Sequence, residues 1–279
     1  MNPDLQKKVE ELEAQLKNVL SEQHESAKLL IRRDLALTRA NEQLKALDIR
    51  KSEFISIAAH QLRTPLSAIK WIMHMLLHDE FRDEFDRKNF IKKASDSTDR
   101  LIALVNDLLE VDHIQSGKYQ VLFDQVDVTE SVKAVAAELQ ALVDARKISL
   151  EMDLSPVIRI RGDAVKLRGV FQNLIENAIK YTTIGGTVKI SARIEGDSVQ
   201  MSFTDSGIGI PDSQKIHIFT KFFRAGNAIR VDTVGSGLGL FIAKEVVERH
   251  GGKIWFESAE GSGTTFFVTL PVAPIESNV

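Results

Sequence analysis

The chain of 279 residues contains no cysteine, and proline is scarce, with 6 residues. The absence of cysteine excludes a disulfide scaffold, thiolate-bound metal sites and a cysteine nucleophile, and it suits a reducing, cytoplasmic location. No apolar run approaches the roughly 20 residues of a membrane-spanning helix, and no signal peptide is evident. A net charge of −3 argues against a nucleic-acid-binding protein that works by neutralising phosphates. We therefore expect a soluble protein without a nucleic-acid partner, or the cytoplasmic portion of a longer, membrane-bound one.

Residues 1–50 have the composition of a long helix. They contain one proline, Pro3, and no glycine, and they are rich in strong helix formers. Apolar side chains recur at heptad spacing, as at Leu16, Leu30, Leu37 and Leu44. This pattern predicts a coiled-coil signalling helix over 1–50 and therefore a partner strand, most simply a second copy of the chain.

Residues 51–118 predict a helical hairpin. Two amphipathic segments are separated by the charged stretch 78–84, and Gly117 is a typical stop for the second helix. One hairpin would leave a broad apolar face uncovered, whereas two hairpins would close a four-helix bundle. We expect this segment to dimerise the chain.

Residues 119–273 have a mixed α and β pattern, and 274–279 form a short tail. Asp127 and Asp163 are expected to cap the first two of three helices, at about 128–146, 164–181 and 237–250. The predicted strands are Tyr119–Phe123, Ile148–Asp153, Thr187–Ile194, Ser198–Thr204, Lys253–Glu257 and Thr264–Leu270. Because the strands fall mostly in adjacent pairs, we expect an α+β two-layer sandwich with helices on one face of the sheet.

Two polar clusters lie on predicted helices. His60 precedes Pro65 by little more than one turn, and a proline there removes a helical hydrogen bond to the carbonyl of Gln61. Asn173, Asn177 and Lys180 share one helix face, where amide oxygens can ligate Mg²⁺ and the ammonium can neutralise phosphate. Taken singly, the second cluster also fits a solvated polar stripe.

Two glycine-rich segments flank residues 212–234. Asp205–Pro211 follows a predicted strand, and Gly235–Leu240 opens a predicted helix. Free N–H groups at a helix N-terminus can bind an anion, although glycine also marks ordinary loops. The intervening segment has no strong periodicity, which indicates a mobile lid between two phosphate-facing loops.

The motifs and their order resemble those of sensor histidine kinases of two-component signalling, and the resemblance covers about residues 50–271. Phe54–Pro65 resembles the H-box of that family. The other matching segments are the N-box at Asn173–Tyr181, the G1 box at Asp205–Ile210, the F-box at Phe219–Arg224, the G2 box at Gly235–Leu240 and the segment Gly263–Phe266.

The resemblance implies a helical hairpin followed by an ATP-binding domain, with a role for each matching residue. His60 would be the phospho-acceptor that attacks the γ-phosphate of ATP, Asn177 would ligate Mg²⁺, and Asp205 would accept the exocyclic amine of adenine. The other implied nucleotide-binding residues are Asn173, Lys180, Tyr181, Gly207, Gly209, Arg224, Gly235, Gly237, Leu238, Gly239 and Thr264. The phosphoryl group would then pass to an aspartate in the receiver domain of a separate response regulator.

One position departs from the family pattern. Gln61 stands where Glu or Asp is usual, and an amide cannot accept the imidazole proton as a carboxylate can. Thr64 lies where the family positions water for dephosphorylation of the partner. One open alternative is a phosphatase-biased or non-catalytic dimeric relay scaffold, motivated by Gln61. Another is an ATPase of the gyrase and chaperone class, which carries a water-activating Glu where this chain has Asn173.

Overall fold

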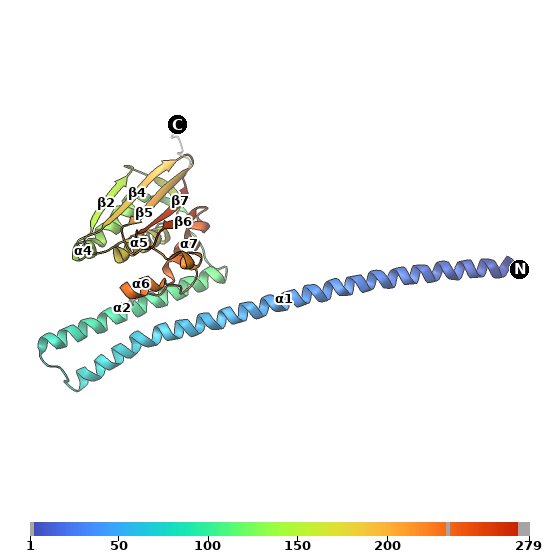
Figure 1. Ribbon diagram of the computed structural model, residues 1–279, viewed down its shortest axis with the longest axis horizontal. Coiled ribbons are helices and arrows are strands. Elements are labelled where there is room, and N and C mark those ends of the chain that lie inside the picture. Colours follow the sequence, from blue (N-terminus) through green and yellow to red (C-terminus); the bar gives the residue numbers. More distant parts are fainter. Residues whose placement is uncertain (1–2, 233–234, 273–279) are drawn as a thin grey trace. The chain divides into compact units, whose positions relative to one another are not determined.

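The computed structural model of the chain describes residues 3–232 and 235–272 (Figure 1). The chain comprises two units, residues 1–59 and residues 60–279. The tail predicted at 274–279 lies outside the described residues. No helix within the described ranges combines the length and the apolar character that a membrane span requires.

The first unit is helical, as its composition predicts. It belongs to helix α1, which covers Pro3–Leu77. The four heptad leucines Leu16, Leu30, Leu37 and Leu44 are between 61% and 69% exposed in the single chain. Apolar side chains in regular register that face solvent are what a coiled-coil partner would cover.

The second unit begins with the predicted helical hairpin. Helix α1 continues through Pro65 and ends at Leu77, and α2 covers Glu84–Gln115. The carboxylate of Asp83 caps α2 by accepting a hydrogen bond from the backbone N–H of Asp86. Gly117 follows α2 with a φ of 70°, a conformation that favours glycine, so the predicted stop is confirmed.

The rest of the second unit is built on a five-stranded sheet with the order β2-β4-β5-β7-β6 (Figure 1). The strands are β2 at Ser149–Leu154, β4 at Thr187–Glu195, β5 at Ser198–Asp205, β6 at Lys253–Ser258 and β7 at Thr264–Pro271. Among these five strands, only β2 and β4 pair in parallel. A separate antiparallel pair joins β1 at Asp124–Asp127 to β3 at Arg159–Gly162.

Helices cover one face of the five-stranded sheet and form the second layer. The predicted caps are confirmed, since Asp127 caps α3 at Val128–Glu138 and Asp163 caps α5 at Ala164–Tyr181. Helix α5 contacts β5, and α3 and α7 at Gly239–Arg249 pack against α5. The core between the layers includes the fully buried side chains of Phe171, Leu174, Ile175 and Phe203. This is the predicted α+β two-layer sandwich.

Two predictions of local structure were wrong. Residues 119–123 form no strand, because the Tyr119 ring is buried against the cations of Lys166 and Arg249 while its hydroxyl donates to Glu110. The helix expected at 128–146 is two helices, α3 and α4 at Gln140–Ala145, which meet at Leu139.

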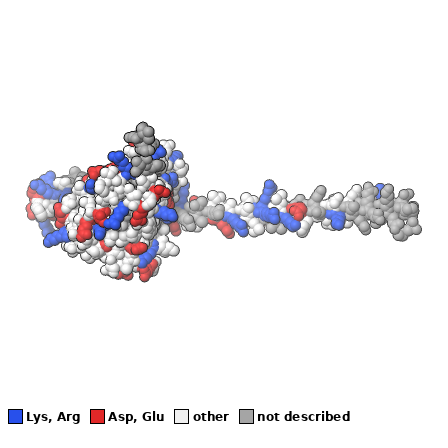
Figure 2. Space-filling view, turned by 90° about the horizontal axis from the view of Figure 1, so that it is seen from above, with Lys and Arg blue, Asp and Glu red and all other residues white. Residues whose placement is uncertain are grey.

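The surface of the folded part carries charges of both signs. Figure 2 shows Lys and Arg side chains interspersed with Asp and Glu over the face in view. Isolated pairs on this surface include Arg193 with Asp153 and Lys133 with Glu130. Such exposed pairs contribute about 0–1 kcal/mol each, so stability depends mainly on the core.

Candidate functional site

A cavity of about 570 Å³ lies in the second unit. This volume suits a small-molecule ligand, for which pockets span about 300–1,000 Å³. It brings together side chains from α5, from both glycine-rich loops and from the segment between them. The sequence-predicted residues that line it are Asn173, Asn177, Lys180, Tyr181, Asp205, Gly209, Arg224, Gly235, Gly237, Gly239 and Thr264.

The other predicted residues lie elsewhere. His60 and Thr64 are exposed on α1, and the Thr64 hydroxyl lies 3.4 Å from the carbonyl oxygen of His60, to which it donates. Gln61 is half-buried beside them. Leu238 belongs to the G2 loop and is fully buried, and Gly207 packs against the backbone of Tyr181.

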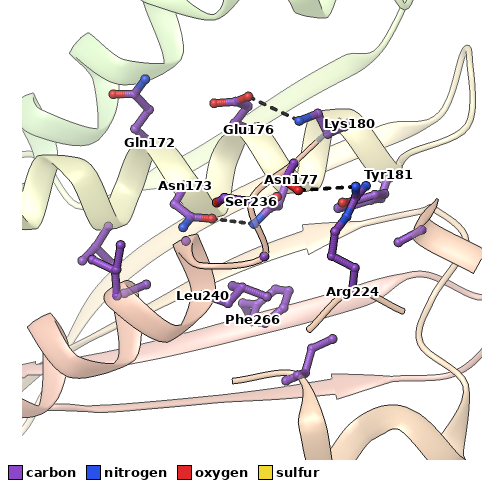
Figure 3. A pocket seen from close by; sticks show the side chains of 18 of the residues that line it. Gln172, Asn173, Glu176, Asn177, Lys180, Tyr181, Arg224, Ser236, Leu240 and Phe266 are labelled. Carbon is purple, nitrogen blue, oxygen red and sulfur yellow. Dashed lines mark hydrogen bonds and ion pairs between the residues drawn. The ribbon is translucent and has the colours of Figure 1, made fainter. Parts of the chain in front are cut away.

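The polar face of α5 forms one wall of the cavity (Figure 3). Asn177 donates from Nδ2 to Oδ1 of Asn173, at 2.6 Å, across one helical turn. This bond fixes the orientation of both amides, so the Oδ1 atom of Asn177 is its remaining acceptor. The apolar residues on the other side of the helix, Leu174 and Ala178, are buried in the core.

The Asp205 carboxyl lies at the end of β5, where only 7% of the residue is exposed. Its Oδ1 accepts the backbone N–H of Gly207 at 2.8 Å. Burial raises the pKa of Asp205 to about 6, although backbone hydrogen bonds from Gly207 and Thr264 partly oppose this rise. A buried carboxylate at a cavity wall is a strong acceptor for a ligand N–H group.

Glycine is required at two positions of the G1 loop. A Cβ on Gly207 would lie 2.1 Å from the carbonyl oxygen of Tyr181. Gly209 has a φ of 61°, and its Cβ would lie 1.9 Å from the carbonyl oxygen of Ala259. Because both obstacles are backbone atoms, only glycine lets the loop pack this closely against Tyr181 and Ala259.

Two cations lie at another part of the cavity. Lys180 forms ion pairs with Glu176, at 3.6 Å, and with Asp232, at 3.1 Å. Arg224 donates to the backbone carbonyl oxygens of Asp232 and Gly235. Figure 3 shows Lys180 and Arg224 reaching the cavity from different elements. Together they can neutralise an anionic ligand group.

The segment between the glycine-rich loops is partly helical, although its sequence has no strong periodicity. It contains a short 3-10 helix, η1, at Asp212–His217 and helix α6 at Gly226–Val231. Residues 233–234 lie outside the described ranges. The sequence did not single out Asn227, which lines the cavity and donates from Nδ2 to the carbonyl oxygen of Gly209 at 2.9 Å.

The G2 loop also contacts the helical hairpin. The Ser236 hydroxyl donates to Oδ2 of Asp107 on α2 at 2.8 Å, and it accepts the backbone N–H of Leu238 at 3.2 Å. Burial raises the pKa of Asp107, the bond from Ser236 lowers it, and the charge of Glu110 raises it further. No sequence pattern predicts this contact, because the two residues lie 129 positions apart.

Comparisons with known proteins agree with this geometry. Residues 162–274 match the family described as histidine kinase-, DNA gyrase B- and HSP90-like ATPase. Residues 50–117 match the His Kinase A (phospho-acceptor) domain. The circadian input-output histidine kinase CikA of Synechococcus elongatus is 33% identical over 273 residues, which cover 95% of this chain but 36% of that protein.

Two solved structures extend the comparison. Histidine kinase ThkA in complex with the response regulator protein TrrA has 26% identity and a TM-score of 0.61, covering 80% of this chain and 62% of that one. Full-length ShkA in complex with AMPPNP has 27% identity and a TM-score of 0.59, covering 80% of this chain and 47% of that one. This chain therefore belongs to the sensor histidine kinases of two-component signalling, and it spans about a third of the length of CikA.

Proposed function

We propose that this chain is an ATP-dependent protein-histidine kinase that phosphorylates itself on His60 and passes the phosphoryl group to an aspartate of a response regulator. The observation that carries the proposal is the cavity, where a buried carboxyl, two amides, two cations and a glycine-rich helix start converge. A nucleotide has groups complementary to these: a base with an amine that can donate to the carboxyl, and a chain of phosphates that can bind the cations.

The nucleotide would bind across the cavity. Asp205 would accept the exocyclic amine of adenine, and Gly207 and Gly209 would let the G1 loop pack against Tyr181 and Ala259 beside the base. Lys180 and Arg224 would neutralise the phosphates, and the backbone N–H groups at the start of α7 would bind them. Tyr181, Leu238 and Thr264 would complete the site around the base and the G2 loop.

The donor set also fits a magnesium ion. Because Asn177 donates to Asn173 through Nδ2, its Oδ1 remains as an amide oxygen of the kind that ligates Mg²⁺. Asn177 would hold the ion, and the ion would neutralise phosphate charge when bound. Asn173 would orient the amide of Asn177.

Phosphoryl transfer needs positioning and charge neutralisation more than covalent help from the protein. A ring nitrogen of His60 would attack the γ-phosphorus, the bond to the β–γ bridging oxygen would break, and ADP would leave. The imidazole proton would pass to solvent or to a nearby acceptor. The phosphoryl group would then move from His60 to a carboxylate oxygen of the response regulator, which regenerates the histidine.

The chain would act in the cytoplasm as a homodimer, with a coiled-coil helix at 1–50, a dimerisation and phospho-acceptor hairpin at 51–118 and the ATP-binding domain at 119–273. The exposed heptad leucines of α1 support this assembly. So do the apolar residues that the hairpin leaves exposed, which include Leu66, Trp71, Ile102 and Leu109.

Gln61 keeps a second candidate open, a phosphatase-biased or non-catalytic relay scaffold. Incubation of the chain with γ-labelled ATP and Mg²⁺ separates the candidates. A kinase gains acid-labile label that His60→Gln abolishes while ATP affinity stays unchanged. An ATPase releases labelled phosphate without retaining it, and a scaffold does neither. Either of the last two results would contradict the proposal.

A further inference from the structure

Asp232 lies in the segment between the two glycine-rich loops and contacts both cations of the cavity. Its carboxylate pairs with Lys180 at 3.1 Å, and its backbone carbonyl accepts a hydrogen bond from Arg224. The two side chains of the ion pair are only 18% and 27% exposed, for Asp232 and Lys180 respectively. The pair is thus partly withdrawn from water, where screening of the charges is weaker.

Lys180 belongs to the wall formed by α5, whereas Asp232 immediately follows α6. The ion pair therefore ties the segment between the loops to the nucleotide wall. Arg224, from the same segment, is turned toward the backbone of Asp232 and Gly235. Asp232 supplies an acceptor to each of the two cations assigned to the phosphates, and Gly235 supplies a second one to Arg224.

We propose that Asp232 competes with the nucleotide phosphates for Lys180. The carboxylate pairs with this lysine before a nucleotide binds and gives it up when a phosphate takes its place. This inference rests on the proposed function, because it requires Lys180 to contact phosphate. A carboxylate oxygen and a phosphate oxygen are alternative acceptors for one ammonium group. Binding of phosphate to Lys180 would therefore free the segment from α5 at Asp232.

The competition has a measurable cost in affinity. When only a fraction of the molecules is in the binding-competent state, the apparent affinity is the intrinsic affinity multiplied by that fraction. A ligand without phosphates leaves the ion pair intact and so avoids the cost. Asp232 would therefore lower the affinity for ATP without changing the affinity for adenosine.

The test compares Asp232→Asn with a matched control, Asp212→Asn. Asn keeps the shape of Asp and removes its charge. Asp212 lies in the same segment and pairs with Lys215 at 2.6 Å, but its side chain is 92% exposed and its partner is not Lys180. The two variants thus change the charge of the segment equally, and only the first removes a carboxylate partner of Lys180, whose pair with Glu176 stays in both.

Binding of ATP and of adenosine is measured by calorimetry, in EDTA and in Mg²⁺. Asp232→Asn is expected to bind ATP about three- to tenfold more tightly, as for a partly buried ion pair, with adenosine unchanged. Asp212→Asn is expected to change ATP affinity less than about twofold. In a Lys180→Gln background, Asp232→Asn should have no further effect.

Several results would overturn the inference. An equal gain in both variants would show a general charge effect, and an equal gain for adenosine would show a general opening of the segment. A loss of ATP affinity confined to Mg²⁺ would make Asp232 a metal ligand instead. If the wild-type chain binds ATP and Asp232→Asn shows no gain, the inference alone fails, whereas absence of ATP binding by the wild type contradicts the proposed function itself.

Discussion

Replacement of Gly239 by alanine is expected to weaken ATP binding while the fold persists. Gly239 is the first residue of α7, and a Cβ there would lie 2.1 Å from Nδ2 of Asn173. The amide of Asn173 must then move by about 1.4 Å to reach the roughly 3.5 Å of a nonbonded contact. Such a shift breaks the hydrogen bond of 2.6 Å from Asn177 to Asn173.

The effect on stability should be small, because the obstacle is the end of a side chain. Loss of the Asn177–Asn173 hydrogen bond costs about 0.5–1.5 kcal/mol, and the better helix propensity of alanine offsets up to about 1 kcal/mol. The effect on binding should be larger, since Asn177 loses the partner that orients its amide. A hydrogen bond to a charged ligand contributes about 1.5–3 kcal/mol, so its loss corresponds to a decrease in ATP affinity of roughly ten- to a hundredfold.

The assay is calorimetric titration with ATP and Mg²⁺, combined with thermal unfolding of each variant. A double-mutant cycle with Asn173→Ala supplies the control, because alanine at 173 removes the obstructed amide. The Asn173→Ala/Gly239→Ala variant should bind ATP no more weakly than Asn173→Ala alone. If Gly239→Ala causes the same loss in both backgrounds, displacement of Asn173 is not the cause and the reasoning is refuted.

Three further perturbations test other parts of the account. Because the pKa of Asp205 is about 6 and its ionised form is the better acceptor, the ATP affinity of the wild type should fall as the pH drops through 6. Asp205→Asn should bind ATP more weakly, with an affinity that does not change over this pH range. A wild-type affinity without this fall would contradict the role of Asp205. Burial raises the pKa of Asp107, so the folded chain favours the protonated carboxyl. This contribution to the free energy of unfolding is fully present below the ordinary pKa of 3.8 and is lost as the pH rises through the raised pKa. Asp107→Asn should therefore raise the melting temperature at neutral pH and lose this advantage in acid, and an equal shift at both would point to packing. Gln61→Glu should speed autophosphorylation in a single-turnover assay, by less than the roughly 10²–10⁴-fold of a well-placed general base. A slower variant with unchanged helix content would instead assign Gln61 a role in orienting the His60 ring.

The sequence predicts the elements in which local and global preferences agree. Helix α5 is one, because Asp163 caps it and its apolar residues recur at helical spacing. The segment at Tyr119–Phe123 has strand-forming residues, yet Tyr119 is held by Glu110, Lys166 and Arg249 from three helices. Local propensity cannot report such long-range contacts.

The contacts around the cavity are likewise only partly predictable from the sequence. The resemblance to the histidine kinases predicts that motifs far apart in the sequence meet at one nucleotide site, and eleven of the predicted residues line the cavity. The contacts of Ser236 with Asp107 and of Asp232 with Lys180 depend on how separate elements pack, across 129 residues in the first case. The burial that raises the pKa of Asp205 is likewise a property of the folded sheet and its neighbours.

Whether His60 accepts the phosphoryl group is tested by locating this group on the chain after incubation with ATP and Mg²⁺. The chain is digested at neutral pH, and the peptides are analysed by mass spectrometry before and after acid treatment. We expect phosphate on the peptide that contains His60, its removal by acid, and its absence in His60→Gln. Acid-stable phosphate on another residue, or ATP turnover with no phosphate retained on the chain, would contradict this expectation.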